Sequence, residues 1–412
     1  TELAKKIMLP FIGDSIPKNV FGTIVEHSYA EFNHTKIAPM KEIGHNQWIA
    51  ELFHGPTLAF KDYPLQIVGR LFDYVLTNRH QKVTIIGATS GDTGSAAIEA
   101  CRNRDSIEIF ILHPAGRVSE VQRRQMTTVK SKNVFNIALD GTFDDCQDMV
   151  KSLFADERFR DAHNLSAINS INWARIMAQI VYYFWTALSL GAPDQKFIYA
   201  VPTGNFGNVY AGYVAKKMGL PIKKLIVATN ENDILQRVIN SGEYKPSKVK
   251  PSLSPSMDVQ VSSNFERLLF DVLNQDDKKV SNLMSNLLSK GSFKLSSEEV
   301  NIMKKDFCAE KTSDKETLEI IKNFSEKYNF ILDPHTATAV GAAKKINDGS
   351  ETLILSTAHP YKFLETIKMA TSKGIKIPSQ LSNTLDKKEK YDILENNLLE
   401  VKNYILEKAN ES

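Results

Sequence analysis

The stretch VTIIGATSGDTGSAAIEA, residues 83–100, decides the fold class, because a short apolar run leads through a glycine-rich turn into a helical pattern. The same alternation continues outward to about residue 230. Its further strand-like runs are IEIFIL (107–112), VFNIAL (134–139), KFIYAVP (196–202) and KLIVAT (224–229). This pattern is typical of parallel βαβ units, and it predicts open, doubly wound α/β sheets.

A chain of 412 residues is long for one core, so we expect two or three domains. The expected division is a large domain that begins with residues 1–82, a small α/β domain at 83–190, the rest of the large domain at 191–385, and a C-terminal helix at 386–412. Residues 240–330 differ in composition from the segments before them: they begin Pro/Ser-rich and continue as charged, helical sequence without strand patterns. We interpret them as a helical insertion of low functional specificity.

Composition excludes several classes of function. With 51 basic and 48 acidic residues and a net charge of +3, nothing favours a nucleic acid or an anionic membrane as partner. The cysteines, Cys101, Cys146 and Cys308, lie far apart, which argues against a disulfide framework or a thiolate metal site. No HExxH motif occurs, so we expect no metal. The opening residues TELAKKIMLPFIGDS are too polar for a signal peptide, so we expect a cytoplasmic protein.

Two strand-to-helix turns could each bind an anion. Gly204-Asn205-Phe206-Gly207-Asn208 follows KFIYAVP, and its glycines would let backbone N–H groups approach a phosphate at a helix N-terminus. Residues 87–94, GATSGDTG, offer three hydroxyls that could hold a carboxylate. Neither turn fits a P-loop, and each could equally be a structural turn or helix cap.

The segment FHGPTLAFKD, residues 53–62, places Lys61 behind a Gly-Pro turn and next to Phe60. A lysine in a shaped, partly apolar turn can form an imine, because desolvation disfavours its charged form. An amine together with two anion-binding turns suggests pyridoxal phosphate as cofactor. That cofactor also needs a partner for its ring nitrogen, and a small polar residue at a strand end would fit, as in Ser356-Thr357-Ala358-His359-Pro360 at the end of ETLIL.

The motifs FHGPTLAFKD, ATSGDTG, NSINWARIMAQIVYYF, PTGNFGN, PSMDV, DPHTATA and STAHPYKF resemble, in order, those of the threonine synthase family in its bacterial and yeast branch. The resemblance covers roughly residues 50 to 365. It implies the fold-type-II, tryptophan synthase β-like architecture of pyridoxal-phosphate enzymes. It also implies conversion of O-phospho-L-homoserine and water to L-threonine and phosphate, by γ-elimination and β-addition. Members of the family carry a further N-terminal segment of several dozen residues, so any substrate contact made by that segment is in doubt.

The family's functional residues carry over position by position. Lys61 matches the Schiff-base lysine, and Thr357 the partner of the pyridine nitrogen. The residues that match the loop for the cofactor phosphate are Gly204, Asn205, Phe206, Gly207 and Asn208, where many members have Asp at the position of Asn208. The residues that match the loop for the substrate carboxylate are Thr89, Ser90, Asp92 and Thr93.

The substrate phosphate needs a cationic site of its own. Our candidates are Arg175 and Lys362, with Ser170 and Asn172 as neutral donors, although Arg175 could equally be a surface group at a helix start. Two other functions stay open: a phospho-lyase that releases 2-oxobutyrate, and a catalytically silent homologue that acts as a binding protein. We expect a monomer or a homodimer that acts on a small molecule.

Overall fold

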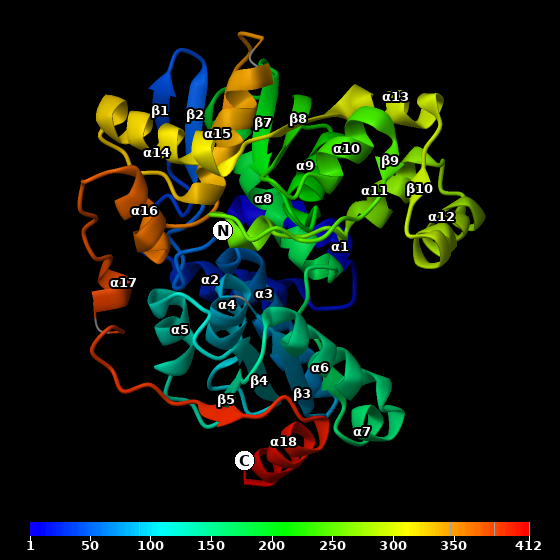
Figure 1. Ribbon diagram of the computed structural model, residues 1–412, viewed down its shortest axis with the longest axis vertical. Helices are drawn as coiled ribbons and strands as arrows, with labels where there is room; N and C mark the ends of the chain where they lie inside the picture. Colours follow the sequence, from blue (N-terminus) through cyan, green and yellow to red (C-terminus); the bar gives the residue numbers. More distant parts are fainter. Residues whose placement is uncertain (90, 347, 383, 412) are drawn as a thin grey trace.

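The computed structural model describes residues 1–89, 91–346, 348–382 and 384–411. It has two lobes, each built on an open sheet, and they lie one above the other in Figure 1. The described residues include no helix that is long and apolar enough to span a membrane. The predicted fold class, two open α/β sheets, is confirmed.

The upper lobe holds a six-stranded sheet in the order β1-β2-β12-β7-β8-β11, in which all neighbours are parallel except β1 and β2. Its strands are β1 (Met40–Gly44), β2 (Gln47–Glu51), β7 (Phe197–Pro202), β8 (Ile222–Thr229), β11 (Phe307–Lys311) and β12 (Thr352–Ser356). Strands β7 and β12, and β8 from Leu225 onward, are buried and mostly apolar because helices cover both faces of the sheet. Along β7, Tyr199 and Val201 enter one core while Ile198 and Ala200 enter the other.

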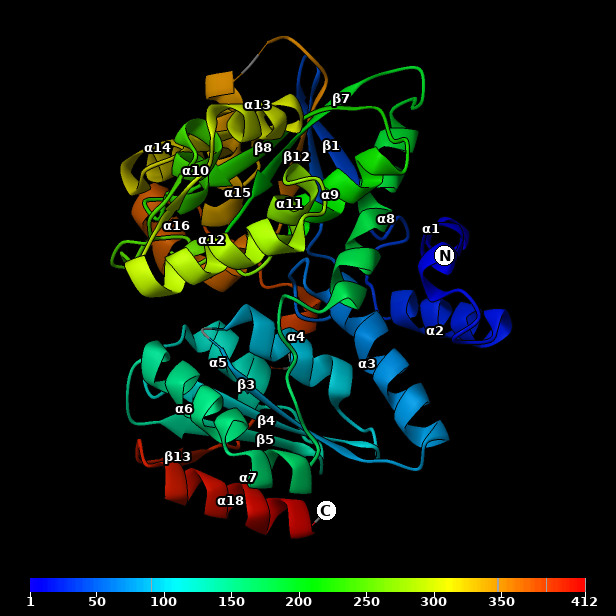
Figure 2. The ribbon, with the colours of Figure 1, turned by 90° about the vertical axis from the view of Figure 1, so that its right-hand side faces the viewer.

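Helices on the Tyr199 face are α1 (Glu2–Ile12), α2 (Lys18–Ala30), α3 (Asp62–Asn78), α8 (Trp173–Ser189), α9 (Gly207–Lys217) and α10 (Ile234–Ser241). Helices on the opposite face are α14 (Asp314–Tyr328), α15 (Pro334–Ile346) and α16 (Leu364–Ala370). Figure 2 shows α1 and α2 projecting to one side of the upper lobe.

The lower lobe holds a parallel five-stranded sheet in the order β13-β5-β4-β3-β6. Its strands are β3 (Val83–Ala88), β4 (Ile107–Pro114), β5 (Val134–Leu139), β6 (Leu165–Ser166) and β13 (Asp392–Leu394). Its helices are α4 (Asp92–Cys101), α5 (Glu120–Thr127), α6 (Phe143–Ala155), α7 (Glu157–Ala162) and α18 (Leu398–Glu411). The helix pairs α4 with α5 and α6 with α18 contribute to separate cores, so this sheet is also covered on both faces.

Two segments lie differently from the expected division of the chain. Helix α8 falls within residues 83–190, yet it packs against α1, α3 and α9 of the upper lobe, because its tyrosine-rich face is buried there. Strand β13 falls within the expected C-terminal helix, yet it pairs with β5, and the helix itself begins only at Leu398. The chain reaches β13 from α16 along one side of the molecule, past α17 (Ser379–Ser382) (Figure 1).

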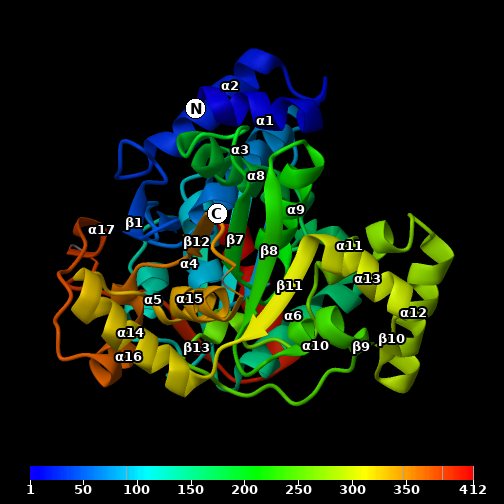
Figure 3. The ribbon, with the colours of Figure 1, turned by 90° about the horizontal axis from the view of Figure 1, so that it is seen from above.

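The expectation that residues 240–330 contain no strands is wrong. Strand β11 joins the edge of the large sheet, and two short strands, β9 (Glu243–Tyr244) and β10 (Phe293–Lys294), form an antiparallel pair. The remaining elements are η1 (Pro255–Met257), α11 (Phe265–Val272), α12 (Asp277–Lys290) and α13 (Ser297–Asp306), and Figure 3 shows most of them gathered at one side. Strand β11 escapes prediction because its short sequence FCAEK carries the polar residues of a sheet edge.

Candidate active site

The turn before Lys61 is held by the next residue, Asp62. The Asp62 carboxylate accepts hydrogen bonds from Thr57 N at 2.9 Å and from Thr57 Oγ1 at 2.6 Å. A Cβ on Gly55 would lie 2.5 Å from Asp62 Oδ2, which explains the glycine. Burial raises the pKa of Asp62 to about 6, and the hydrogen bonds from Thr57 oppose that rise. Asp62 therefore shapes the turn that carries Lys61.

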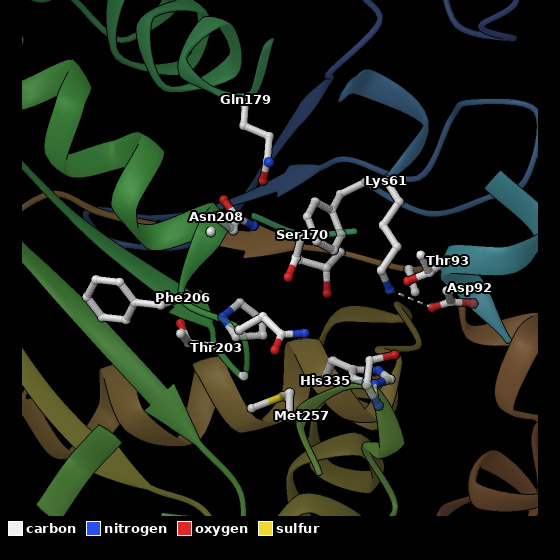
Figure 4. A pocket seen from close by; sticks show the side chains of 18 of the residues that line it. Lys61, Asp92, Thr93, Ser170, Gln179, Thr203, Phe206, Asn208, Met257 and His335 are labelled. Carbon is white, nitrogen blue, oxygen red and sulfur yellow. Dashed lines mark hydrogen bonds and ion pairs between the residues drawn. The ribbon is translucent and has the colours of Figure 1, made fainter. Parts of the chain in front are cut away.

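The amine of Lys61 lies in a pocket between the lobes. Lys61 Nζ is 3.7 Å from Asp92 Oδ2 and 5.4 Å from the centroid of the Phe60 ring (Figure 4). Burial lowers the pKa of Lys61, the cations of Lys362 and Arg175 lower it further, and the Asp92 carboxylate opposes them. This lysine is thus disposed to lose its proton more easily than one in water.

The glycine-rich loop lies across the pocket from Lys61, between β7 and α9 (Figure 4). The carbonyl of Gly204 accepts from Ser262 Oγ at 2.7 Å, and that of Asn205 accepts from Asn264 Nδ2 at 2.9 Å. Phe206 caps α9 with a φ of 64°, and the first N–H groups of a helix have no partner within it. The loop therefore ties up its carbonyls and keeps donors available, as an anion site requires.

The Asn208 side chain adds a donor to this loop. Its Oδ1 contacts the hydroxyls of Tyr182 at 2.7 Å and Tyr183 at 3.0 Å. Its Nδ2 is buried and has no hydrogen-bond partner in the structure. A buried amide without a partner costs free energy, so this nitrogen is suited to an acceptor in the pocket. An Asp at this position would lack the donor.

Thr357 lies in the pocket wall, and its backbone is held from two sides. Its N–H donates to Thr336 Oγ1 at 3.3 Å, while its carbonyl accepts from Phe60 N at 2.9 Å. The Thr336 hydroxyl in turn donates to the buried carboxylate of Asp333. The position of Thr357 is thus fixed relative to the turn that carries Lys61.

Arg175 is the clearest anion-binding candidate outside the glycine-rich loop. The side chain lines the pocket and is 5 % exposed, and neither Nε nor Nη1 has a hydrogen-bond partner in the structure. Burial alone lowers its pKa to about 10. A buried guanidinium without a carboxylate is costly, so an anionic ligand is its natural counterpart. The hydroxyl of Ser170, 2.8 Å from Ser263 Oγ, lies in the same wall.

The predicted carboxylate loop is only partly in the pocket. Asp92 and Thr93 line it, as expected. Thr89 is not among the lining residues, because its Oγ1 accepts from the backbone N–H groups of Gly91 at 3.0 Å and Gly94 at 2.9 Å. Its hydroxyl oxygen therefore holds the start of α4 through the N–H of Gly94. Ser90 lies outside the described residues.

Two of the predicted phosphate ligands also have structural roles. Lys362 is fully buried, and its Nζ lies 2.7 Å from Asp92 Oδ1 and 2.8 Å from the carbonyl of Thr57. Asn172 accepts from Ala174 N at 2.9 Å and caps α8. Neither residue lines the pocket. The geometry therefore gives no support to the assignment of either residue to the substrate phosphate, which stays a prediction.

Several pocket residues were missed. Gln179 lies one helical turn after Arg175 on α8, so helical spacing could have found it. Ser256, Met257 and His335 come from the motifs PSMDV and DPHTATA, and His335 Nε2 accepts from Ser256 N at 3.2 Å. The expectation that the insertion has low functional specificity is wrong, since its residues form part of the wall and hold the carbonyls of the glycine-rich loop.

The pocket fits a small aldehyde that carries a phosphate. The predicted residues that line it are Lys61, Asp92, Thr93, Ser170, Arg175, Thr357 and the whole loop 204–208. A Cβ on Gly204 would lie 3.0 Å from Met257 Cα and 3.1 Å from the carbonyl of Ser256, so the loop could not pack this way with a larger residue. A reactive amine, a donor-rich loop and the unpartnered Asn208 Nδ2 are what pyridoxal phosphate requires.

These features are those of a pyridoxal-phosphate dependent enzyme, and comparison with known proteins agrees. The chain matches the pyridoxal-phosphate dependent enzyme family over residues 34–285 and the threonine synthase C-terminal domain over residues 336–405. It is 48 % identical to a threonine synthase of Pseudomonas aeruginosa, over 99 % of this chain and 88 % of that protein.

Two solved structures are similarly close. The chain is 46 % identical to the pyridoxal-phosphate-bound threonine synthase of Brucella melitensis, with a TM-score of 0.97 over 99 % of this chain and 88 % of that one. It is 42 % identical to the yeast threonine synthase, with a TM-score of 0.94 over 100 % of this chain and 89 % of that one. The chain belongs to the threonine synthase family of pyridoxal-phosphate dependent enzymes.

Proposed function

We propose that the protein converts O-phospho-L-homoserine and water to L-threonine and phosphate, with pyridoxal phosphate as its cofactor. The observation that carries the proposal is the presence of two separate anion-binding sets in one pocket. The loop 204–208 is one set, and the unpartnered guanidinium of Arg175 is the other. A phosphorylated cofactor and a phosphorylated substrate need two such sets.

Three parts of the pocket would hold the cofactor. Lys61 would bind its aldehyde carbon, the loop 204–208 its phosphate, and the hydroxyl of Thr357 its ring nitrogen. When bound, pyridoxal phosphate supplies an electron sink for the carbon skeleton of the amino acid attached to it. A hydroxyl donates a hydrogen bond to the ring nitrogen but cannot hold it protonated as a carboxylate would, so Thr357 would temper that sink.

The proton transfers are assigned to the amine of Lys61. Because burial lowers the pKa of Lys61, its amine loses its proton more easily than a lysine in water, and once neutral it can accept a proton from Cα or Cβ of the substrate. The same nitrogen can return a proton to Cγ after phosphate has left. The turn set by Asp62 keeps the amine directed into the pocket during these transfers.

The substrate would be held at its two anionic ends. Arg175 and Ser170 would bind its phosphate, since a charge-assisted hydrogen bond to a guanidinium is strong in a buried site. Thr93 and the N-terminal turn of α4 would bind its carboxylate, because the first N–H groups of a helix are unpaired. Ser90 stays a proposed member of this second set.

Product analysis tests this function. The holoenzyme is incubated with O-phospho-L-homoserine, and phosphate, threonine, 2-oxobutyrate and ammonia are measured, with unphosphorylated homoserine and the Lys61→Ala variant as controls. We expect phosphate and threonine in equal amounts. Phosphate with 2-oxobutyrate and ammonia would assign the phospho-lyase reaction instead. A cofactor-loaded protein that releases no phosphate would contradict both reactions and favour a silent homologue.

We further propose that the protein works in the cytoplasm on this small molecule, as a monomer or homodimer. The three cysteines support a reducing compartment, since all are free and two are buried. Burial raises the pKa of the Cys101, Cys146 and Cys308 thiols to about 12, so none is disposed to react as a thiolate. Light scattering of the purified holoenzyme would decide between one and two copies.

A further inference from the structure

Lys362 occupies an unusual position for a lysine. It lies in the turn η2 (Pro360–Phe363), directly after β12, and its side chain is fully buried. Its Nζ lies 2.7 Å from Asp92 Oδ1 and donates to the carbonyl of Thr57 at 2.8 Å. A charged amine is rarely buried without a partner, so Asp92 is the group that makes this burial possible.

Asp92 has two lysines but only one negative charge. Lys362 is at hydrogen-bond distance from Oδ1, whereas Lys61 Nζ stands 3.7 Å from Oδ2. Gln122 Nε2 also donates to Oδ1 at 2.8 Å, which fixes the carboxylate toward Lys362. The nearer, fully buried cation therefore takes most of the stabilisation that Asp92 can give.

We propose that Lys362 is a positioning residue that serves as the permanent counter-ion of Asp92, so that Lys61 has no close anion of its own and meets an aldehyde as a free amine. In this arrangement Asp92 and Lys362 form a neutral pair at the edge of the pocket. Asp92 still lies 3.7 Å from Lys61 Nζ through Oδ2 and helps to aim the amine. Without Lys362, the same carboxylate would hold Lys61 as an ammonium.

The other charged groups near Lys61 agree with this assignment. Arg175 reaches the pocket from α8 as a second cation and lowers the pKa of Lys61. Asp62, the neighbour of Lys61 on α3, directs its carboxylate to Thr57. His335, from α15, accepts from Ser256 N at Nε2 and contacts Asp333 through Nδ1. None of these groups supplies Lys61 with an anion.

The ion pair also joins the two lobes. Asp92 and Gln122 belong to α4 and α5 of the lower lobe, whereas Lys362 and Thr57 belong to segments next to the upper sheet. The amine is therefore set in its reactive state only when the lobes meet at this point. The inference rests on the cofactor site of the proposed function, but not on the identity of the substrate.

The test measures the reactivity of Lys61 directly. The full-length chain, freed of cofactor with hydroxylamine, is labelled with formaldehyde and cyanoborohydride across pH 6 to 10, and the peptide that contains Lys61 is quantified by mass spectrometry. In Lys362→Met we expect labelling of Lys61 at pH 8 to slow about tenfold, because Asp92 then stabilises the ammonium form. Lys362→Arg keeps the cation and should label like the parent.

Two further variants complete the cycle. Asp92→Asn leaves two cations and no anion, so labelling of Lys61 should extend to lower pH than in the parent. The double variant Lys362→Met with Asp92→Asn should return close to the parent profile. If Lys362→Met does not fold, as judged by circular dichroism, the Asp92→Asn and Lys362→Arg profiles decide.

The outcomes separate this inference from the function. A folded Lys362→Met protein with an unchanged profile, an Asp92→Asn profile that does not move to lower pH, or a Lys362→Arg profile shifted as far as that of Met would overturn the role of Lys362. None of these results touches threonine formation. A parent protein in which Lys61 does not bind pyridoxal phosphate would instead overturn the cofactor site.

Discussion

The two glycine-rich loops at residues 87–94 and 202–208 both join a strand to the start of a helix, but they present different groups to the pocket. The loop at 202–208 offers unpaired helix N–H groups and the unpartnered amide of Asn208, and no carboxylate. The other loop uses the Thr89 hydroxyl to hold the start of α4 and presents the carboxylate of Asp92.

This difference supports the ligands proposed for the two loops. A phosphate is stabilised at a helix N-terminus lined with donors, whereas a carboxylate such as Asp92 repels it. Asp92 instead suits an amine, and Lys61 is the amine beside it. Loops of similar composition can therefore serve different groups: 202–208 a phosphate alone, and 87–94 the Lys61 amine at Asp92 beside the carboxylate proposed for the α4 N-terminus. The deciding factor is which polar groups remain unused after the loop has folded.

The largest expected effect comes from removing the amine of Lys61, which lies beside Asp92 of the loop 87–94. Lys61→Ala should lower threonine formation about a thousandfold or more, because both the attachment of the cofactor and the proton transfers depend on Nζ. Phosphate release and threonine are measured with the purified variant. Activity within tenfold of the parent would show that another group carries the chemistry.

The second-largest effect is expected from replacing Arg175, the proposed binding group for the substrate phosphate. Arg175→Met should lower kcat/KM for O-phospho-L-homoserine about a hundredfold, because a buried charge partner of the phosphate is lost. The ligand-free variant should be no less stable than the parent, since the guanidinium is buried without a partner. Steady-state kinetics and thermal unfolding check both parts, and Arg175→Lys should recover some activity. A destabilised variant with normal KM would make Arg175 structural.

Crowding the phosphate loop should have a smaller effect. In Gly204→Ala the new Cβ would lie 3.0 Å from Met257 Cα, so the loop must shift and cofactor affinity should fall about tenfold. Gly374→Ala is the matched control, because nothing lies within 4 Å of its Cβ position. Cofactor binding is titrated by fluorescence. Equal affinities for both variants would contradict the assignment of this loop.

The smallest kinetic effect is expected at Thr89, whose hydroxyl already accepts two backbone hydrogen bonds. Thr89→Ala should destabilise the protein by about 1 kcal/mol through loss of these bonds at the start of α4, and leave KM within about twofold. Thr142→Ala, which removes the cap of α6, should cost a similar amount. Urea unfolding and kinetics compare the two variants. A large rise in KM for Thr89→Ala alone would return Thr89 to the substrate site.

Much of the fold could be predicted because apolar strands and amphipathic helices alternate from residue 83 to 230. Strand β11 was missed because a short edge strand carries little apolar signal. Helix α8 was assigned to the wrong neighbours, since periodicity shows that a helix has an apolar face but not which sheet it covers.

For the site too, local sequence patterns do not show which groups contact one another in the folded chain. Lys61 and the loop 204–208 could be predicted because their turn chemistry and family motifs are local in sequence. The structural contacts of Thr89, Asn172 and Lys362 could not be predicted, because a sequence does not show whether a polar group is used by a helix start or a buried ion pair. Ser256 and His335 were missed because they reach the pocket from distant segments.

The central claim is that Lys61 and the loop 204–208 form one cofactor site. The most direct measurement is borohydride reduction of the holoenzyme, followed by proteolysis and mass spectrometry. We predict that the cofactor-derived mass is found on the peptide that contains Lys61 and on no other lysine. A mass on a different lysine, or none on a protein that has bound pyridoxal phosphate, would contradict the account.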